Sequence, residues 1–505
     1  MGIFGEKREQ IPPHPRREPR LTGPLTPEGV EAAFGGCVDF ERRVFWLNND
    51  PDRQVELCYV NGQVRAERAS DYLLRPLCAN ERLSRATLDE AYDLLKSGGV
   101  YTLSVQERTT MDEVVFDIID GWVAMFFPGK KNALVFASAT EEKRSVSPPE
   151  NEPDIKGARD AFVESVRTNT SLVRRRFRAP ELRIKEYKVG RQSVTPVDVL
   201  WVDGIAYPSL VEKTVGRVSA IDIAALLQPD FLEEYIVDET ATAFPLVAYT
   251  ERPDRFCAGL AEGRVGILAD GIPMGYLVPG TIDRFLRAGQ DKSQNWMVAT
   301  VLSLLRYACV LVTLLLPGLY IAAAVYHPEL IPLRLNLSII AAKEHVPFTT
   351  LTEVLVMLFA FEVLQEAGLR LPSSIGQTVS ILGGLVVGSA AVEARIVSPV
   401  VLVVVAIAGI AGYTTPSQDL AAALRLWRFG LTVAAGMAGL LGLTLGVICL
   451  VIRLASLETF GVPYLTPFAA AKGERKAGHG VLRQPLKWTK LRESYLNTPN
   501  RRNQG

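Results

Sequence analysis

Two carboxylates in the apolar second half of the chain are the residues best placed to do chemistry. Glu353 and Glu362 lie in the apolar segment 351–364. An ionised group at membrane depth costs roughly 3 kcal/mol on insertion scales, and such groups usually face protein or a water-filled path. Rings of acidic side chains concentrate cations in ion-conducting pores. Both carboxylates are therefore candidates for lining an ion pathway.

A structural alternative exists for the same two residues. Nine positions separate Glu353 from Glu362, and at 100° per residue they point to opposite sides of a helix, so they do not form one acidic stripe. Either carboxylate could instead pair with a basic neighbour such as Arg306. The sequence leaves the pathway and the ion pair open.

The apolar segment 375–392 holds a second group of candidates. Gln377, Thr378 and Ser380 lie near its start and are further candidates for the ion pathway. Small residues also recur every four positions, which favours close helix packing over direct pore lining. The stripe consists of Ser380 together with Gly376, Gly384 and Gly388.

Long apolar runs contain these residues. About 20 helical residues at 1.5 Å rise cross the hydrocarbon core of a bilayer, and a helix satisfies its own backbone hydrogen bonds there. The apolar segments are 297–325, 351–364, 375–392, 396–413 and 429–454. We therefore expect an α-helical, multi-pass membrane domain over residues 296–464, with four to six crossings.

The charge distribution supports a division into a head, a membrane domain and a tail. The chain has 55 basic and 55 acidic residues overall. We expect residues 465–505 to form a basic cytoplasmic tail, because residues 472–505 hold nine Lys or Arg and two Glu. Such a tail either binds anionic lipid or is a solvated end that follows the positive-inside rule. Residues 1–25 contain no apolar signal segment and predict a disordered leader, so the head is expected on the cytoplasmic side.

The head is expected to be α/β, with two subdomains at residues 26–140 and 157–290. Residues 141–156, rich in Ser, Pro and Glu, predict a linker between them. In the first subdomain, the segments 113–127 and 132–137 flank a Pro-Gly turn and predict a hairpin. In the second subdomain, periodicity predicts a helix over 158–177, followed by strands at 182–189 and 197–202.

The residues around two groups of arginines indicate where these side chains lie. The run 174–176 could bind an acidic group, but it is expected to be a solvated helix end near the membrane. Arg425 and Arg428 are expected to lie on an interfacial amphipathic helix, with their cations toward lipid headgroups.

Enzyme and metal functions find little support. The six cysteines show no CxxC spacing, and the four histidines are scattered. The chain has no HExxH or GxSxG motif and no phosphate-binding P-loop. We therefore expect no catalysis, no metal site and no cofactor.

Several blocks of sequence resemble the A subunit of GerA-type spore germinant receptors. The resemblance runs in order from about residue 155 to residue 467, whereas residues 1–145 match only in position and general character. The blocks are RTNTSLVRRRF (167–177), YTERPDR (249–255), EGRVGILADGIPMGYLVPGT (262–281), LPGLYIAAAVYHPELIP (316–332), IGQTVSILGGLVVGSAAV (375–392) and ETFGVPYLTP (458–467).

The resemblance implies a multi-pass protein of the endospore inner membrane. Because the head and the tail are both expected on the cytoplasmic side, both termini would then lie on the core side. It implies that nutrients trigger a complex with a transporter-like B subunit and a lipoprotein C subunit. It also implies that A subunits oligomerise into a ligand-gated cation channel. The alternatives are an accessory membrane protein similar to stage V sporulation protein AF, a secondary transporter, and a scaffold that only organises its partners.

Overall fold

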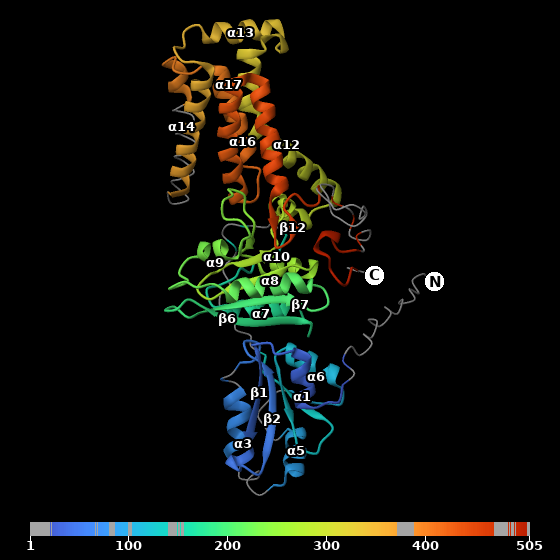
Figure 1. Cartoon of the computed structure of the whole chain (residues 1–505). Helices are drawn as coiled ribbons and strands as arrows, with labels where there is room; N and C mark the ends of the chain where they lie inside the picture. The colour runs from blue at the N-terminus through green and yellow to red at the C-terminus, as the bar shows by residue number, and fades with distance from the viewer. Residues whose placement is uncertain are drawn as a thin grey trace, which may run out of the picture.

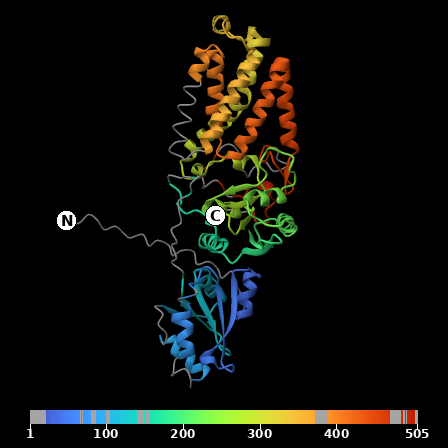
Figure 2. The same cartoon turned by 90° about the vertical axis from the view of Figure 1, so that its left-hand side faces the viewer.

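The structure is a computed structural model that describes residues 21, 23–65, 67, 69–79, 86–98, 104–139, 149, 152, 156–370, 388–468, 483, 485, 489 and 491–501. The molecule is elongated, with two α/β layers stacked below a group of long helices (Figure 1). We call residues 27–137 the outer layer, residues 166–286 the middle layer and residues 296–456 the helical part. The same stacking is seen from the side (Figure 2).

The outer layer is an antiparallel five-stranded sheet with helices on both faces. Helices α1 (Pro27–Phe34) and α6 (Met111–Ile119) pack on one face, and α3 (Arg75–Ala79) and α5 (Leu88–Lys96) pack on the other. The strands in spatial order are β1 (Phe40–Trp46), β2 (Gln54–Val60), β4 (Trp122–Phe126), β5 (Ala133–Ala137) and β3 (Val105–Arg108).

The expected hairpin over 113–127 and 132–137 is only half right. Strands β4 and β5 pair as expected, but residues 111–119 form helix α6. Thr110 caps this helix by accepting a hydrogen bond from the backbone of Glu113 at 3.4 Å. The buried residues of α6 recur at helical spacing, which sequence analysis had taken for a strand.

The middle layer repeats this architecture. Helices α7 (Val166–Arg176) and α10 (Pro253–Glu262) cover one face of its sheet, and α8 (Pro208–Ser219) and α9 (Pro229–Ile236) cover the other. The short helix α11 (Ile282–Leu286) follows the sheet. The strands in spatial order are β6 (Leu182–Val189), β7 (Thr195–Val202), β9 (Val265–Ala269), β10 (Gly275–Val278) and β8 (Ala248–Thr250), all antiparallel.

A buried ion pair joins the outer and middle layers. Arg174 of α7 donates to both carboxylate oxygens of Asp39 at 2.7 and 2.9 Å, and both side chains are buried. Gln63 adds a hydrogen bond to the backbone oxygen of Ser171 at 2.8 Å. The expectation of a solvated arginine run is therefore wrong for Arg174, because the outer layer covers this face of α7.

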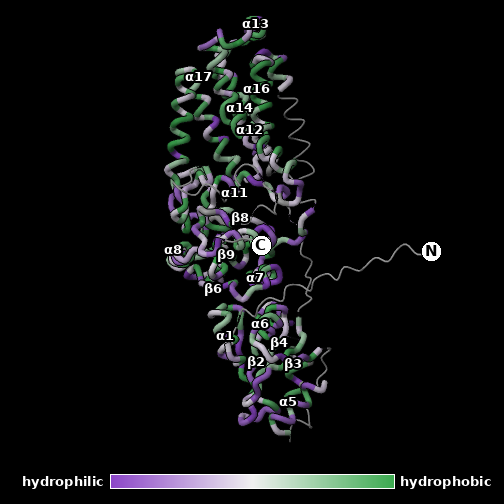
Figure 3. The backbone as a smooth tube through the Cα atoms, turned by 90° about the vertical axis from the view of Figure 1, so that its right-hand side faces the viewer, coloured by the Kyte–Doolittle hydropathy of each residue, from purple (hydrophilic) through white to green (hydrophobic). Residues whose placement is uncertain are grey.

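The helical part consists of α12 (Trp296–Ile321), α13 (Leu333–Lys343), α14 (Thr350–Arg370), α16 (Pro399–Gly412) and α17 (Gln418–Ser456). Within the described residues, two helical stretches, 296–326 and 418–456, are long and apolar enough to cross a membrane by length and composition, and the second of them is bent. Apolar residues dominate this end of the molecule, whereas the layers are mixed (Figure 3). Helix α14 extends beyond the expected segment 351–364 at its C-terminal end.

Helix α17 is a helical hairpin. The backbone leaves helical angles at Ala438 (φ −136°, ψ 16°) and Gly439 (φ 62°, ψ −137°). Both arms return to the middle layer, because Trp427 stacks on Phe244 and Arg453 pairs with Glu239 at 2.6 Å. The prediction that 429–454 forms one membrane span is therefore wrong, because the chain reverses at Gly439.

One hydrophobic core runs through the middle layer into the helical part. Buried residues of α7 and α10 belong to the same cluster as Leu420, Leu431 and Leu450 of α17. The short hairpin β11 (Glu458–Thr459) and β12 (Val462–Pro463) leads to Tyr464, which is fully buried in this cluster. The two parts are therefore packed together rather than merely linked.

The C-terminal segment, residues 491–501, also returns to the middle layer. Arg492 donates to the backbone oxygen of Ala261 at 2.8 Å, and Arg264 donates to the hydroxyl of Tyr495 at 3.0 Å. The methyl group of Thr498 lies beside Gly263. This part of the basic tail is docked on protein rather than free in solvent.

Candidate functional site

Glu353 lies in the first turn of α14 and is 1% exposed. Its Oε2 accepts a hydrogen bond from the backbone N–H of Ser398 at 2.8 Å, and its Oε1 is 3.6 Å from Nζ of Lys343. Ser398 is the N-cap of α16, so the carboxylate occupies the positive end of that helix dipole. Glu353 thus ties together α13, α14 and α16.

Glu362 faces two arginines of α17. Its Oε1 is 2.8 Å from Nη1 of Arg425, and its Oε2 is 3.6 Å from Nη2 of Arg428. Arg428 is only 2% exposed. The expectation that both arginines point toward headgroups is therefore wrong. Three positions separate them on the helix, which places both on the face that meets α14.

The structure does not bring Glu353 and Glu362 together, since each contacts different helices. Arg306 pairs with neither; it pairs with Asp291 at 2.9 Å. Basic neighbours are thus present, but they are Lys343, Arg425 and Arg428. A void of about 20 Å³ beside Arg428 is large enough for one water molecule.

The remaining candidates lie largely outside the described residues. This holds for Gln377, Thr378 and Ser380, and for Gly376 and Gly384 of the small-residue stripe. Gly388 is described, and a Cβ added there would lie 3.2 Å from Cδ1 of Leu402 in α16. The roles of these residues stay predictions.

A large charged cleft lies where the middle layer meets the helical part, and sequence analysis did not single it out. We call it the junction cleft; its volume is about 640 Å³. Its lining comes from Glu152, from α9 to α11, and from residues 416–419 at the start of α17. The available signal was the spacing of two arginine pairs, Arg252 with Arg255 and Arg284 with Arg287, each three residues apart. In the structure, Arg252 is the N-cap of α10 and Arg287 is the C-cap of α11.

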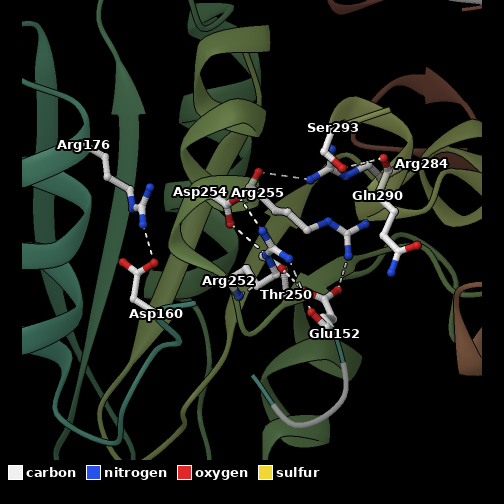
Figure 4. A network of polar contacts seen from close by, with 10 residues as sticks. All are labelled: Glu152, Asp160, Arg176, Thr250, Arg252, Asp254, Arg255, Arg284, Gln290 and Ser293. Carbon is white, nitrogen blue, oxygen red and sulfur yellow. Dashed lines mark hydrogen bonds and ion pairs between the residues drawn. The ribbon is translucent and has the colours of Figure 1, made fainter. Parts of the chain in front are cut away.

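Most guanidinium groups near the cleft have carboxylate partners. Arg255 pairs with Glu152, and Arg252 pairs with Asp254 at 2.7 Å (Figure 4). Arg287 lies 2.7 Å from Asp283 and 3.3 Å from Glu493 of the C-terminal segment. Burial raises the pKa of Glu493 to about 7, against the opposing effect of Arg287.

Arg284 differs from these neighbours. Its Nη2 donates to the backbone oxygen of Arg255 at 3.2 Å. Within the part of the chain that the structure describes, no carboxylate lies within ion-pair distance of it. Burial lowers the pKa of Arg284 to about 10. The charges of Glu262 and Glu152 oppose this effect, and the charge of the adjacent Arg255 adds to it. The cleft therefore holds a guanidinium that has no direct ion pair among the described residues.

The rest of the charged lining is acidic. Glu233 and Glu234 come from α9, and Asp419 comes from the first turn of α17. Apolar side chains lie among these groups, including Phe244, Leu246 and Phe285. The cleft thus offers an anion-binding group, carboxylates and apolar surface to one occupant.

Comparison with known proteins gives one family. The model for the Bacillus/Clostridium GerA spore germination protein matches residues 28–495. The membrane protein YfkQ of Bacillus subtilis (strain 168), described as uncharacterized, is 38% identical over 88% of this chain and 86% of its own. Spore germination protein KA of the same organism is 33% identical over 90% of this chain and 84% of its own.

Two further similarities were found. Stage V sporulation protein AF of Bacillus subtilis is 31% identical over 89% of this chain and 90% of its own. The crystal structure of the N-terminal domain of the A subunit of the Bacillus megaterium spore germinant receptor GerK3 is 26% identical. It covers 49% of this chain and 91% of that domain, with a TM-score of 0.38.

Proposed function

Because the chain belongs to the GerA spore germination family, we propose that it is the A subunit of a nutrient-responsive germinant receptor. In this proposal the subunit is a multi-pass protein of the endospore inner membrane. It oligomerises into a ligand-gated cation channel and works with a transporter-like B subunit and a lipoprotein C subunit. Opening of the channel starts germination.

The exposed apolar surface of the helical part supports the membrane assignment. Only 33% and 28% of the most apolar stretches of 296–326 and 418–456 are buried. The core helix of a soluble protein would be mostly buried, whereas these helices expose large apolar side chains. Examples are Leu305, Leu311, Leu441 and Ile448. An apolar surface of this kind is suited to lipid or to partner helices.

The single observation that carries the proposal is the continuous core between the middle layer and α12 and α17. A ligand-gated channel requires that events in its soluble head bias the arrangement of its membrane helices. Leu314 of α12 and Leu431 of α17 share one core with residues of α7 and α10. A shift of the middle layer would therefore displace both helices.

Within this proposal, Glu353 and Glu362 are candidates for the ion pathway, together with Gln377, Thr378 and Ser380. Each carboxylate touches a basic side chain within one subunit. Opening would have to change those contacts before a carboxylate could face passing cations. Gly376, Gly384 and Gly388 are proposed as the helix contact that supports assembly.

Electrical recording of the reconstituted full-length chain tests the channel. We expect a cation-selective conductance in lipid bilayers that contain the chain with its B and C subunits and nutrient. Glu353→Gln or Glu362→Gln should change conductance or selectivity at normal protein abundance. Glu344→Gln, an exposed acidic residue after α13, is the matched control and should behave as the parent.

Other outcomes would select other functions. Transport at carrier rates would favour a secondary transporter, and a complete lack of ion flux would favour a scaffold. The similarity to stage V sporulation protein AF supports an accessory role as the second candidate. Deletion of the gene separates this role from a receptor subunit. Loss of the response to one nutrient indicates a receptor subunit, whereas slower germination with every nutrient indicates an accessory protein.

A further inference from the structure

The junction cleft is bounded by both the middle layer and the helical part. Its lining combines β8, α9, α10 and α11 with residues 416–419, which include the cap and first turn of α17. A volume of about 640 Å³ falls within the usual range for small-molecule sites. An occupant would therefore touch the α/β layer and the start of α17 at the same time.

Arg284 supplies a positive charge to this cleft that Glu262 and Glu152 offset only in part, because no described carboxylate lies within ion-pair distance of it. The adjacent Arg255 and Arg287 already face Glu152 and Asp283. Arg284 donates to one backbone oxygen, whereas a guanidinium has five N–H donors. A charge enclosed by protein without a partner is unfavourable, so binding of an anionic group there would remove that penalty.

The remaining charges argue against a plain anion as the occupant. The lining contains five carboxylates, from Glu152, Glu233, Glu234, Glu239 and Asp419, and three guanidiniums, from Arg255, Arg284 and Arg287. A simple anion would be repelled by this acidic excess. A molecule that also carries a cationic group would be attracted by it.

We propose that the junction cleft binds a small zwitterion. Its anionic group, a carboxylate or phosphate, lies on Arg284, and its ammonium group lies beside the carboxylates of Glu234 and Asp419. The apolar side chains of Phe244 and Phe285 accommodate the carbon chain between the two charges. The ligand class follows from the cleft alone.

The consequence for gating rests on the proposed function. Asp419 lies in the first turn of α17, which begins the helical hairpin. A ligand that bridges Arg284 and Asp419 favours whichever arrangement of α17 brings the two groups to the right separation. It shifts the population of that arrangement by its difference in affinity for the two states.

Calorimetric titration of the full-length chain in phosphatidylglycerol nanodiscs tests the site. The probe is O-phosphoethanolamine, which carries a phosphate and an ammonium group. Ethyl phosphate and ethylamine each carry one of the two charges. We expect O-phosphoethanolamine to bind at least tenfold more tightly than either. Equal affinity for ethyl phosphate, or no detectable binding of O-phosphoethanolamine, would overturn the proposal.

Variants separate the two ends of the ligand. Arg284→Gln should weaken O-phosphoethanolamine binding at least tenfold, and Arg284→Lys should retain part of the affinity. Glu234→Gln should bind O-phosphoethanolamine more weakly but bind ethyl phosphate as tightly as the parent or more tightly, because it removes one of the repelling charges. Arg191→Gln is the matched control, since Arg191 pairs with Asp222 on the surface of the same layer, outside the cleft.

Thermal unfolding separates binding from a structural role. Arg284→Gln removes a charge whose burial costs more than its distant carboxylates return, so the ligand-free variant should unfold at the parental temperature or above it. A lower unfolding temperature together with lost binding would make Arg284 a structural residue and refute the assignment. Neither measurement requires ion flux, so a failure of the channel proposal would leave this result intact.

Two sources could supply this chemistry, a soluble zwitterion or the headgroup of phosphatidylethanolamine. The titration is therefore repeated in nanodiscs that contain phosphatidylethanolamine. If the lipid headgroup is the natural occupant, it competes and weakens the apparent affinity of the probe. If the natural occupant is soluble, the affinity is the same in both membranes.

Discussion

At the scale of single residues, Asp198 is the most unusual carboxylate of the middle layer. It is fully buried on β7, its Oδ2 is 3.3 Å from Nη1 of Arg167, and its Oδ1 has no described hydrogen-bond partner. Burial raises its pKa to about 7, and the nearby Arg167 opposes this only in part. The folded state therefore holds a proton on Asp198 that the unfolded chain releases near pH 4.

This shift gives a pH-dependent effect for Asp198→Asn. The parent loses stability as pH rises from about 4 to about 7, because the folded state binds more protons there than the unfolded state. Asparagine does not titrate, so the stability of the variant relative to the parent should increase as pH rises through this range. Above pH 7, the free energy of unfolding of the variant should exceed that of the parent by at most about 4 kcal/mol, because each unit of pKa shift corresponds to about 1.4 kcal/mol. Thermal unfolding at pH 5 and pH 8 measures it, with the exposed Asp222→Asn as control. A gain that is independent of pH would contradict the assigned titration.

The buried pair between Arg174 and Asp39 gives a second prediction at this scale. Arg174→Met should destabilise the contact between the two layers by about 3–5 kcal/mol, because it leaves the carboxylate of Asp39 buried without a partner. Arg178→Met is the control, because Arg178 also links the layers, through an exposed pair with Asp120 at 3.1 Å. Its loss should cost at most about 1 kcal/mol. Chemical denaturation measures the free energy of unfolding of the two variants. Similar losses for both would contradict the larger contribution assigned to the buried pair.

At the scale of elements, the turn in α17 depends on one glycine. Gly439 has φ +62° and ψ −137°, angles that side-chain-bearing residues strongly avoid. A Cβ at this position would also lie 2.7 Å from Cγ of Tyr326. The reversal of the helix at this point is therefore specified locally as well as by packing.

Gly439→Ala should destabilise the helical part by about 1–3 kcal/mol through backbone strain. The control is Gly430→Ala on the first arm of the same hairpin, where an added Cβ meets nothing within 4 Å. Alanine there should stabilise the helix by about 0.5–1 kcal/mol. Thermal unfolding in detergent should thus shift in opposite directions for the two variants. A shift in the same direction would argue against the hairpin.

At the scale of the whole molecule, the arrangement places the C-terminal segment and both arms of α17 at the middle layer, with α13 at the far end (Figure 1). If the helical part crosses a membrane, the head and the tail share one side. The loop between α13 and α14 then faces the other side. This is the topology proposed for the receptor subunit.

Cysteine labelling tests this topology. A reagent that cannot cross the membrane should label Phe348→Cys, in the loop before α14, on intact protoplasts. It should miss Leu227→Cys on the middle layer and Leu491→Cys in the C-terminal segment, all three parental side chains being exposed. The background lacks Cys78, Cys309 and Cys449, the native cysteines that are not buried. Labelling of only one of the two inner positions would refute the shared side.

The sequence by itself determined those properties that depend on neighbouring residues along the chain. Apolar runs at 297–325 and 429–454 predicted the helical part, and the residue blocks between 167 and 467 indicated the family, which the comparisons confirm. The α/β character of both layers was also predicted, although residues 111–119 were misread because a short apolar run fits a strand or a helix.

Only the tertiary structure decided which distant segments meet. It paired Glu362 with Arg425, 63 positions away in the sequence. It buried Arg174 against Asp39 and reversed α17 at Gly439. The junction cleft likewise combines residues from 152 to 419. Hydropathy and periodicity are local properties, whereas an ion pair or a cleft depends on which faces pack together, and packing is decided by the whole molecule.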